Sequence, residues 1–406
     1  MKKKTRTAII LILGVALAVI LALRITRETP MEPVLEQNVP EETLAPTPAP
    51  SPVPTSTPEL APNLDPIDAR ALELLEDMTT HEKICQLFVV YPQAVESING
   101  SMLTGMEQYP VGGFLYDMNA LAALGREGII QRNVDLQEWA EIDLIITADE
   151  EGGRVKRLMS ALGTNPISAM FCYKDDGPQT AYDNAATIAG DLQSFGFNTN
   201  LAPVADVWSN RANTVIGDRA FSDDFSQAAE LVSGAVSAYK DAGLICTLKH
   251  FPGHGDTFED SHSGAATVTK SVEEMESAEF LPFISGIAAG ADMVMVGHLT
   301  VSVLSDVPAT VSPEIVNGLL REKLGFNGVI ISDGLEMSAV AALYKNGELE
   351  VLAIEAGIDI LLAPASLEVS ITAITEAVES GRISASRLDE SVLRILRMKL
   401  ENGIIK

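Results

Sequence analysis

Short apolar runs alternate with helical segments along most of this chain, and this alternation constrains its fold more than any other feature. The runs consist of residues that favour β-structure and lack polar alternation, as the buried strands of a parallel sheet do. We expect eight strands, at residues 85–90, 112–116, 144–148, 200–206, 245–251, 292–297, 329–332 and 359–363. Eight such units predict an α/β fold, a (β/α)8 TIM-type barrel. A doubly wound open sheet is the alternative that the same pattern allows.

The segments between the runs carry helix signals. Thr79 and Glu82 are spaced as a capping box, which predicts the start of a helix. Helical patterns follow at 183–196, 225–243 and 312–325, and the last two close with glycine in C-cap position. Strands that alternate with helices in this way belong to a parallel sheet whose faces are covered.

Ionisable residues follow or end several of the predicted strands. In a parallel barrel the carboxyl ends of all strands meet at one mouth, where barrel enzymes place their catalytic groups. We therefore expect a ring of functional side chains formed by Asp149, Asp206, Lys249, His250, His298 and Asp333.

The stretch KHFPGHGDTFEDSH, residues 249–262, contains three of the five histidines of the chain. Pro252 and Gly253 interrupt it, so His250 and His254 cannot act as ligands four residues apart on a metal-binding helix. A metal held by the loop, or a polar loop with a structural role only, stays open as an alternative.

Acid–base chemistry is the interpretation that these residues favour. Asp260 and His262 are two positions apart, so in an extended loop both side chains point the same way and the carboxylate can orient the imidazole. A histidine near neutral pH can donate a proton and then accept one. Such a pair needs a nucleophile or a water molecule opposite it, and Asp333 is the candidate. We expect neither a metal nor another cofactor.

The same stretch closely resembles the signature loop of glycoside hydrolase family 3, in its single-domain β-N-acetylglucosaminidase branch. The resemblance covers residues 70–400 and implies one (β/α)8 barrel without a second, sandwich domain. Further stretches match this family in the same order, at 149–155, 200–207, 215–222, 308–337 and 355–364.

The resemblance also implies a retaining mechanism and roles for individual residues. Asp333 matches the family's nucleophile, which forms a glycosyl-enzyme intermediate, and His262 matches this branch's acid/base, with Asp260 as its partner. Glu150 stands where many relatives have glutamine, and we expect it to tune the rim of the site. The family's sugar-binding positions are matched by Asp149, Arg219, Lys249 and His250.

The activity that follows is that of an exo-β-N-acetylglucosaminidase, which removes terminal β-linked N-acetylglucosamine from cell-wall or chitin-type fragments. A different β-glycoside such as a glucoside, or phosphorolysis in place of hydrolysis, stays open within the same chemistry. A non-catalytic wall-binding barrel is the alternative from another class. The formal charge of −28 argues against nucleic acid as a partner. No sequence feature indicates an oligomeric state.

The N-terminal residues predict export and attachment to a membrane. Basic residues at 2–6 precede sixteen apolar residues at 8–23, which favours an uncleaved signal anchor over a cleaved signal peptide within 1–28. We expect this segment alone to contact the membrane and the rest to lie on the extracellular face or in the cell-wall space. Eleven of the 21 prolines lie in 29–66, which predicts a disordered Pro/Thr/Ser-rich linker before a catalytic domain at 67–406.

Overall fold

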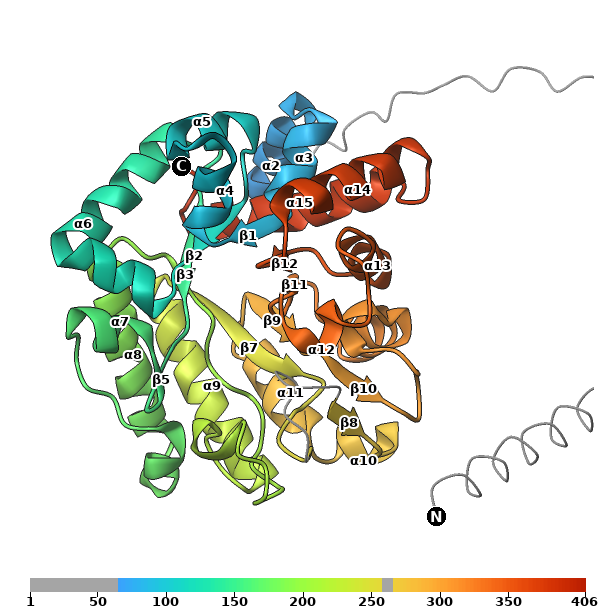
Figure 1. The fold of residues 1–406 in the computed structure, drawn as a ribbon. Helices are drawn as coiled ribbons and strands as arrows, with labels where there is room; N and C mark the ends of the chain where they lie inside the picture. Colours follow the sequence, from blue (N-terminus) through green and yellow to red (C-terminus); the bar gives the residue numbers. More distant parts are fainter. Residues whose placement is uncertain (1–64, 258–265) are drawn as a thin grey trace, which may run out of the picture. The chain divides into compact units, whose positions relative to one another are not determined.

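The computed structural model describes residues 65–257 and 266–406, which form an α/β barrel of parallel strands (Figure 1). Eight strands form one sheet in the order β11-β9-β7-β6-β3-β2-β1-β12, and every neighbouring pair is parallel. An isolated parallel bridge between Ile331 and Ile360 joins β11 to the residue before β12, so the sheet nearly closes on itself. This arrangement agrees with the predicted TIM-type barrel and not with an open doubly wound sheet.

All eight predicted strands are present. They are β1 (Phe88–Val90), β2 (Gly113–Leu115), β3 (Ile145–Ala148), β6 (Thr199–Asn200), β7 (Ile245–Phe251), β9 (Met293–Val296), β11 (Val329–Ser332) and β12 (Leu361–Leu362). Strand β6 is shorter than the predicted run at 200–206. Pro203 has no N–H to donate to a ladder, and beyond it only an isolated bridge between Val204 and Lys249 continues the pairing.

The helices surround the strands, and their ends follow the predicted signals. Thr79 and Glu82 form both hydrogen bonds of a capping box at the start of α3, and Gly243 ends α9 with a left-handed φ of 67°. The segment predicted as a helix at 312–325 is a π-helix, η4 (Glu314–Lys323). Leu324, which follows it, donates its N–H to Leu319 O at 2.9 Å. The α-helices are α2 (Pro66–Asp77), α3 (Thr80–Gln86), α4 (Pro92–Asn99), α5 (Met102–Gln108), α6 (Met118–Trp139), α7 (Arg157–Leu162), α8 (Pro178–Ser194), α9 (Phe225–Ala242), α10 (Val272–Glu276), α11 (Phe280–Ala288), α12 (Ser338–Ala341), α13 (Glu348–Ala356), α14 (Leu367–Glu379) and α15 (Ala385–Glu401).

Several shorter elements lie outside the eight-stranded sheet. Two small sheets are formed by β4 (Glu150–Gly152) with β5 (Val155–Lys156) and by β8 (Ala266–Val268) with β10 (Leu299–Val301). Three short 3-10 turns are η1 (Met170–Asp176), η2 (Gly217–Arg219) and η3 (Ala309–Val311).

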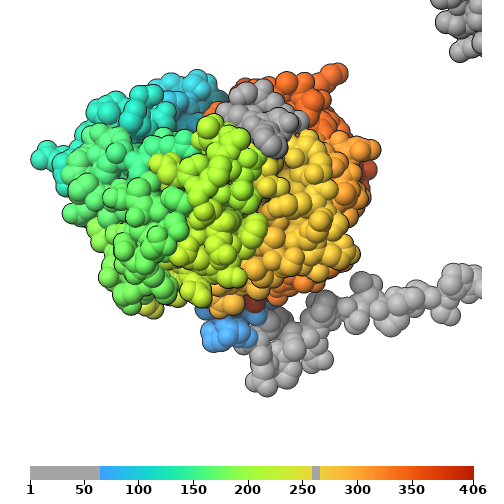
Figure 2. All heavy atoms as spheres, turned by 90° about the horizontal axis from the view of Figure 1, so that it is seen from below, coloured from blue at the N-terminus to red at the C-terminus, as the bar shows by residue number. Residues whose placement is uncertain are grey.

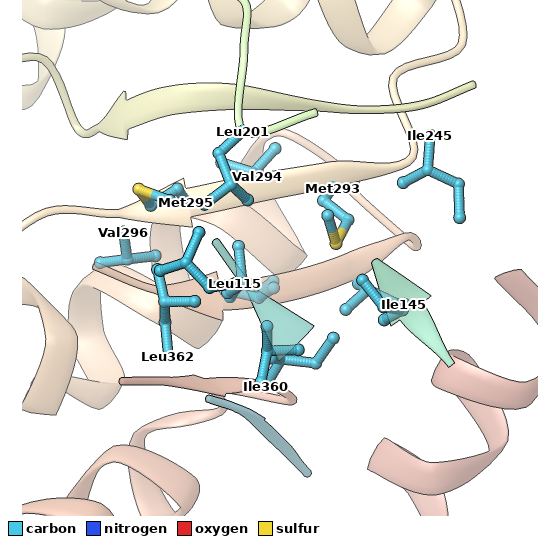
Figure 3. Close-up of a cluster of buried hydrophobic side chains, with 14 of the residues drawn as sticks. Leu115, Ile145, Leu201, Ile245, Met293, Val294, Met295, Val296, Ile360 and Leu362 are labelled. Atoms are coloured by element: carbon cyan, nitrogen blue, oxygen red, sulfur yellow. The ribbon is translucent and has the colours of Figure 1, made fainter. Parts of the chain in front are cut away.

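The interior of the barrel is filled by apolar side chains, so it is a packed core and not a channel. Figure 3 shows this core, in which Leu115, Met293 and Met295 are almost completely buried. Outside the strands, consecutive helices such as α8, α9 and α11 pack against one another, and α15 packs against α2. In Figure 2 the colours of the surface accordingly follow the order of the chain from green through yellow to orange.

The predicted N-terminal segments lie outside the described residues, as do almost all of the predicted linker positions. Helix α2 begins at Pro66, one residue before the predicted start of the catalytic domain, with the Asp65 side chain accepting a hydrogen bond from Ile67 N. Among residues 65–257 and 266–406, none of the helices is long and apolar enough to cross a membrane. The apolar run at 8–23 is not among these residues.

Candidate active site

A cavity of about 140 Å³ lies at the carboxyl ends of the strands and is lined by five of the seven described residues for which a place in the site was predicted. The other two, Asp206 and His298, do not line it; His298 instead lies 2.8 Å from Thr310 Oγ1 and 2.9 Å from Gly334 O through its two ring nitrogens. Leu201, Met295 and Leu362 from the barrel core supply its apolar wall, and Val155 and Arg157 also line it. The predicted acid/base residues, Asp260 and His262, lie outside the described residues. The five predicted residues in the cavity are Asp149, Arg219, Lys249, His250 and Asp333.

Lys249, at the carboxyl end of β7, is the centre of an ion-pair network. Its side chain is only 2% exposed, and Nζ lies 2.6 Å from Asp149 Oδ1 and 2.8 Å from Glu151 Oε1. Arg219, in η2, donates to both oxygens of Glu151 at 2.9 Å. The two cations and two carboxylates balance, which reduces the cost of burying four charges.

The ion pairs keep the buried side chains of this network charged. Burial favours the neutral form of Glu151, but Arg219 and Lys249 outweigh it and hold the pKa of Glu151 below its usual range. Burial alone would lower the pKa of Lys249. Asp149 and Glu151 have the larger opposite effect, so the pKa lies above its usual value. At neutral pH the cavity therefore presents a fixed set of charged hydrogen-bond donors and acceptors.

Asp206 holds His250 in one orientation. Asp206 is 1% exposed, and its Oδ2 lies 2.7 Å from His250 Nδ1 and accepts a hydrogen bond from His250 N at 3.1 Å. Burial opposes ionisation of Asp206, but His250 favours it, and the net effect lowers the pKa of this carboxyl. An ionised Asp206 accepts from Nδ1–H, which leaves Nε2 of the ring available on its other side.

Asp333 follows β11 and is held by the backbone around it. Asp333 N donates to Val296 O at 3.0 Å, and Asp333 Oδ1 accepts from Gly334 N at 2.8 Å. Burial would raise the pKa of Asp333, but His250 and His298 lower it, and the net shift is below the usual value. The group is therefore a carboxylate at neutral pH, the form that a nucleophile needs.

Two residues of the site were not predicted from the sequence: Arg157, which lines the cavity, and Glu151, which belongs to the ion-pair network but does not line the cavity. Glu151 was passed over in the motif DEEGG, although it is the carboxylate that Lys249 and Arg219 share. Its position in the short strand β4, just after β3, was the available signal. Arg157 lines the cavity, and its side chain makes no hydrogen bond or ion pair with other described residues, so the guanidinium is available to a ligand.

The expectation that Glu150 tunes the rim is wrong. Glu150 is 4% exposed, and its carboxyl accepts hydrogen bonds from Leu158 N at 2.7 Å and Met159 N at 3.2 Å, at the start of α7. Alternation along β4 turns Glu150 away from the cavity that Asp149 lines. Burial raises the pKa of Glu150 to about 7.

Replacing Glu150 by glutamine is expected to stabilise the protein at pH 8 and to do so by only a fraction of that amount at pH 5. The pKa of Glu150 is about 7 when folded, against about 4.3 for an unfolded chain. Ionising the buried carboxyl therefore costs stability progressively from about pH 4 to pH 7, and the full cost persists above that range. Thermal unfolding of both proteins from pH 4.5 to 8.5 measures the difference, and a difference that does not grow with pH would contradict this interpretation.

A larger cavity of about 300 Å³ lies at the opposite end of the barrel. Gln86, Val111 and Leu144, which precede β1, β2 and β3, are among its lining residues. Its ionisable lining residues are all acids, so this cavity lacks the paired charges of the cavity at the strand ends. Within the described part of the chain, no group of three or more His, Cys, Asp or Glu side chains is arranged to hold a metal ion.

The parallel barrel places this chain among the TIM-type barrels. Its carboxylate and paired charges form a polar, ligand-sized site at the carboxyl ends of the strands, where such barrels bind their ligands. The chain belongs to glycosyl hydrolase family 3, because it matches the N-terminal domain of that family over residues 79–398. The resemblance noted in the sequence is thereby confirmed.

Individual relatives are similar over most of the described residues. The chain is 32% identical to beta-hexosaminidase A of Pseudoalteromonas piscicida over 288 residues, covering 65% of this chain and 48% of the relative. It is 31% identical to the beta-N-acetylglucosaminidase/beta-glucosidase of Cellulomonas fimi over 346 residues, covering 81% of this chain and 59% of the relative. The solved family 3 beta-N-acetylglucosaminidase of Paenibacillus sp. str. FPU-7 superposes with a TM-score of 0.75 at 35% identity, covering 80% and 63% of the two chains. This chain thus spans about half to two thirds of the length of these relatives.

Proposed function

We propose that this protein is a retaining exo-β-N-acetylglucosaminidase that removes terminal β-linked N-acetylglucosamine from cell-wall or chitin-type fragments. One observation supports this proposal above others: Asp333, an ionised carboxylate, shares a small cavity with the network around Lys249. A neutral sugar offers hydroxyl groups that each donate and accept, and paired charged groups in a buried site can satisfy both functions.

In this proposal, Asp149, Arg219, Lys249 and His250 bind the hydroxyls of the terminal sugar, and Arg157 adds a further donor. Asp333 attacks the anomeric carbon, so that a carbon–oxygen bond to Asp333 forms as the glycosidic carbon–oxygen bond breaks. His262, oriented by Asp260, donates its proton to the leaving oxygen. His262 then takes a proton from water, whose oxygen attacks the same carbon and releases Asp333.

A panel of 4-nitrophenyl β-glycosides, assayed with and without inorganic phosphate, tests this function. We expect kcat/KM for the N-acetylglucosaminide to exceed that for the glucoside by about 100-fold, product with retained configuration by NMR, and no effect of phosphate. A preference for the glucoside would contradict the proposed substrate. Formation of a sugar 1-phosphate would replace hydrolysis by phosphorolysis, and binding of chitin fragments without turnover would favour the wall-binding alternative.

We also propose that the protein acts outside the cell, attached through residues 8–23. The basic and apolar pattern of 1–28 supports this proposal. Fractionation of cells that express the full chain tests it: we expect the protein in the membrane fraction and accessible to protease added to intact cells. Recovery from the cytosol would exclude it.

A further inference from the structure

His298, two residues after the end of β9, contacts the chain just beyond Asp333. The residue is 1% exposed, and its Nε2 lies 2.9 Å from Gly334 O. A carbonyl oxygen only accepts hydrogen bonds, so Nε2 carries the hydrogen and donates it. His298 was predicted to belong to the ring of functional side chains at the mouth, but it does not line the cavity. Any role of His298 in the site must therefore be exerted through its neighbours.

Gly334 in turn orients the carboxylate of Asp333. Its N–H donates to Asp333 Oδ1 at 2.8 Å, and its carbonyl oxygen also accepts from Met337 N at 3.1 Å. Glycine has the widest choice of φ and ψ of any residue, so hydrogen bonds from its surroundings are needed to fix the direction of its N–H. The bond from His298 comes from the end of another strand. It therefore links the orientation of the Asp333 carboxylate to β9.

Thr310 holds the imidazole from its other side. Its hydroxyl oxygen lies 2.8 Å from His298 Nδ1, and Thr310 is completely buried in the short turn η3. The same hydroxyl lies 3.2 Å from Gly297 O, so this turn is also joined to the chain that follows β9. Asp333 N donates to Val296 O, the last residue of β9, at 3.0 Å. The end of β9 thus contacts Asp333 directly and, through His298, the residue that follows it.

We propose that His298 is a positioning residue: held by Thr310 and bonded to Gly334, it sets the direction in which the Asp333 carboxylate faces the anomeric carbon. This inference rests on the proposed function, because it needs Asp333 as the nucleophile. Neither His298 nor Thr310 lines the cavity, so binding of the sugar is left to the network around Lys249. A reacting group displaced by about 1 Å can lose roughly 100-fold in rate.

Two amide substitutions separate the two contacts of the ring. The amide group of asparagine is attached at Cβ and lies near the place of histidine Nδ1, whereas that of glutamine is one carbon further out, near the place of Nε2. His298→Asn therefore keeps a polar partner for Thr310 and loses the donor to Gly334 O. His298→Gln keeps that donor and loses the partner of Thr310.

Two further variants complete the set. Thr310→Val removes the hydroxyl and keeps the branched shape of the side chain, so it loosens the ring without removing its donor to Gly334. His81→Asn is the matched control, because His81 Nε2 also lies 2.8 Å from a backbone carbonyl oxygen, that of Gln108. His81 belongs to α3, which precedes β1 and is remote from the strand ends at the mouth.

The assay measures kcat/KM for the aryl glycoside that the wild type hydrolyses fastest, and the inhibition constant of the free sugar that it releases. We expect His298→Asn to lower kcat/KM about 100-fold, and His298→Gln and Thr310→Val each about 5-fold to 10-fold. The inhibition constant should stay within about 2-fold of the wild-type value in all three, because only the reaction and not the binding of the sugar depends on the direction of Asp333. His81→Asn should match the wild type.

A loss in His298→Asn no greater than that in His298→Gln would overturn the positioning role, because the donor to Gly334 would then not matter. So would an inhibition constant that rises as much as kcat/KM falls, since the whole site would then be disturbed. If His298→Asn does not fold, Thr310→Val decides: its expected loss supports the role, and wild-type activity overturns it.

The assignment of Asp333 is tested separately by Asp333→Asn in the same assay. If Asp333→Asn is inactive while His298→Asn is as active as the wild type, the inference about His298 fails and the nucleophile stands. If Asp333→Asn keeps its activity, the proposed nucleophile itself fails.

Discussion

Replacing Asp333 by asparagine is expected to abolish turnover of an aryl N-acetylglucosaminide while the fold stays intact. An amide oxygen is too weak a nucleophile to form the glycosyl-enzyme bond, so we expect kcat/KM to fall by at least about 10⁴-fold. The folded structure tolerates the change, because the amide oxygen of the new side chain would still accept from Gly334 N and the backbone bond to Val296 O does not involve the side chain. Steady-state kinetics and thermal unfolding measure the two effects.

The control for this variant is Asp389→Asn, a change from aspartate to asparagine that removes only the ion pair with Lys83. It should leave kcat/KM unchanged. A second variant, Asp333→Ala, tests the covalent role directly: added azide should restore turnover and yield a glycosyl azide of inverted configuration, because the anion attacks without a covalent enzyme intermediate. Turnover by Asp333→Asn at more than about a tenth of the wild-type rate would exclude Asp333 as the nucleophile.

Replacing Lys249 by methionine is expected to damage both binding and stability. The cation is shared by Asp149 and Glu151, so its removal leaves Glu151 with Arg219 alone and Asp149 with solvent. We expect a loss of about 3 kcal/mol in the free energy of unfolding, since an incompletely paired carboxylate stays buried. We expect kcat/KM to fall by on the order of 1000-fold, because a donor to the sugar is lost and the carboxylates that it orders are displaced.

Lys399→Met is the matched control, since Lys399 is another completely buried lysine of the barrel. It lies at the opposite end, where Nζ donates to the neutral acceptors Gln86 Oε1 at 3.0 Å and Gly112 O at 3.1 Å. Burial lowers the pKa of Lys399 to about 7, so its charge is costly and its removal should not lower activity. If Lys249→Met and Lys399→Met reduced kcat/KM equally, the loss would reflect the packing of the barrel and not the network at the mouth.

The barrel could be predicted because a strand that is buried on both faces consists mainly of apolar residues, and such a run is visible in a short stretch of sequence. The run at 329–331 is apolar, since both faces of β11 are covered, and Asp333, which follows the strand, must then lie at the mouth. The same reasoning predicted that Lys249 and His250, at the end of their strand, would lie at the mouth of the barrel. It did not distinguish Glu150 from Glu151, because which of two adjacent carboxylates faces inward depends on how the chain passes from β3 to β4.

The sequence alone therefore determined the class of fold, the family and the strand ends that carry the charged residues, because burial periodicity and motif spacing are local properties of a chain. Only the tertiary structure decided which charges pair: Glu151 with Lys249 and Arg219, Asp206 with His250, and Lys270 with Asp256. These pairs join residues from different elements, several of them far apart in the chain. Their distances are set by how the strands are staggered and how the loops pack, which no single segment encodes.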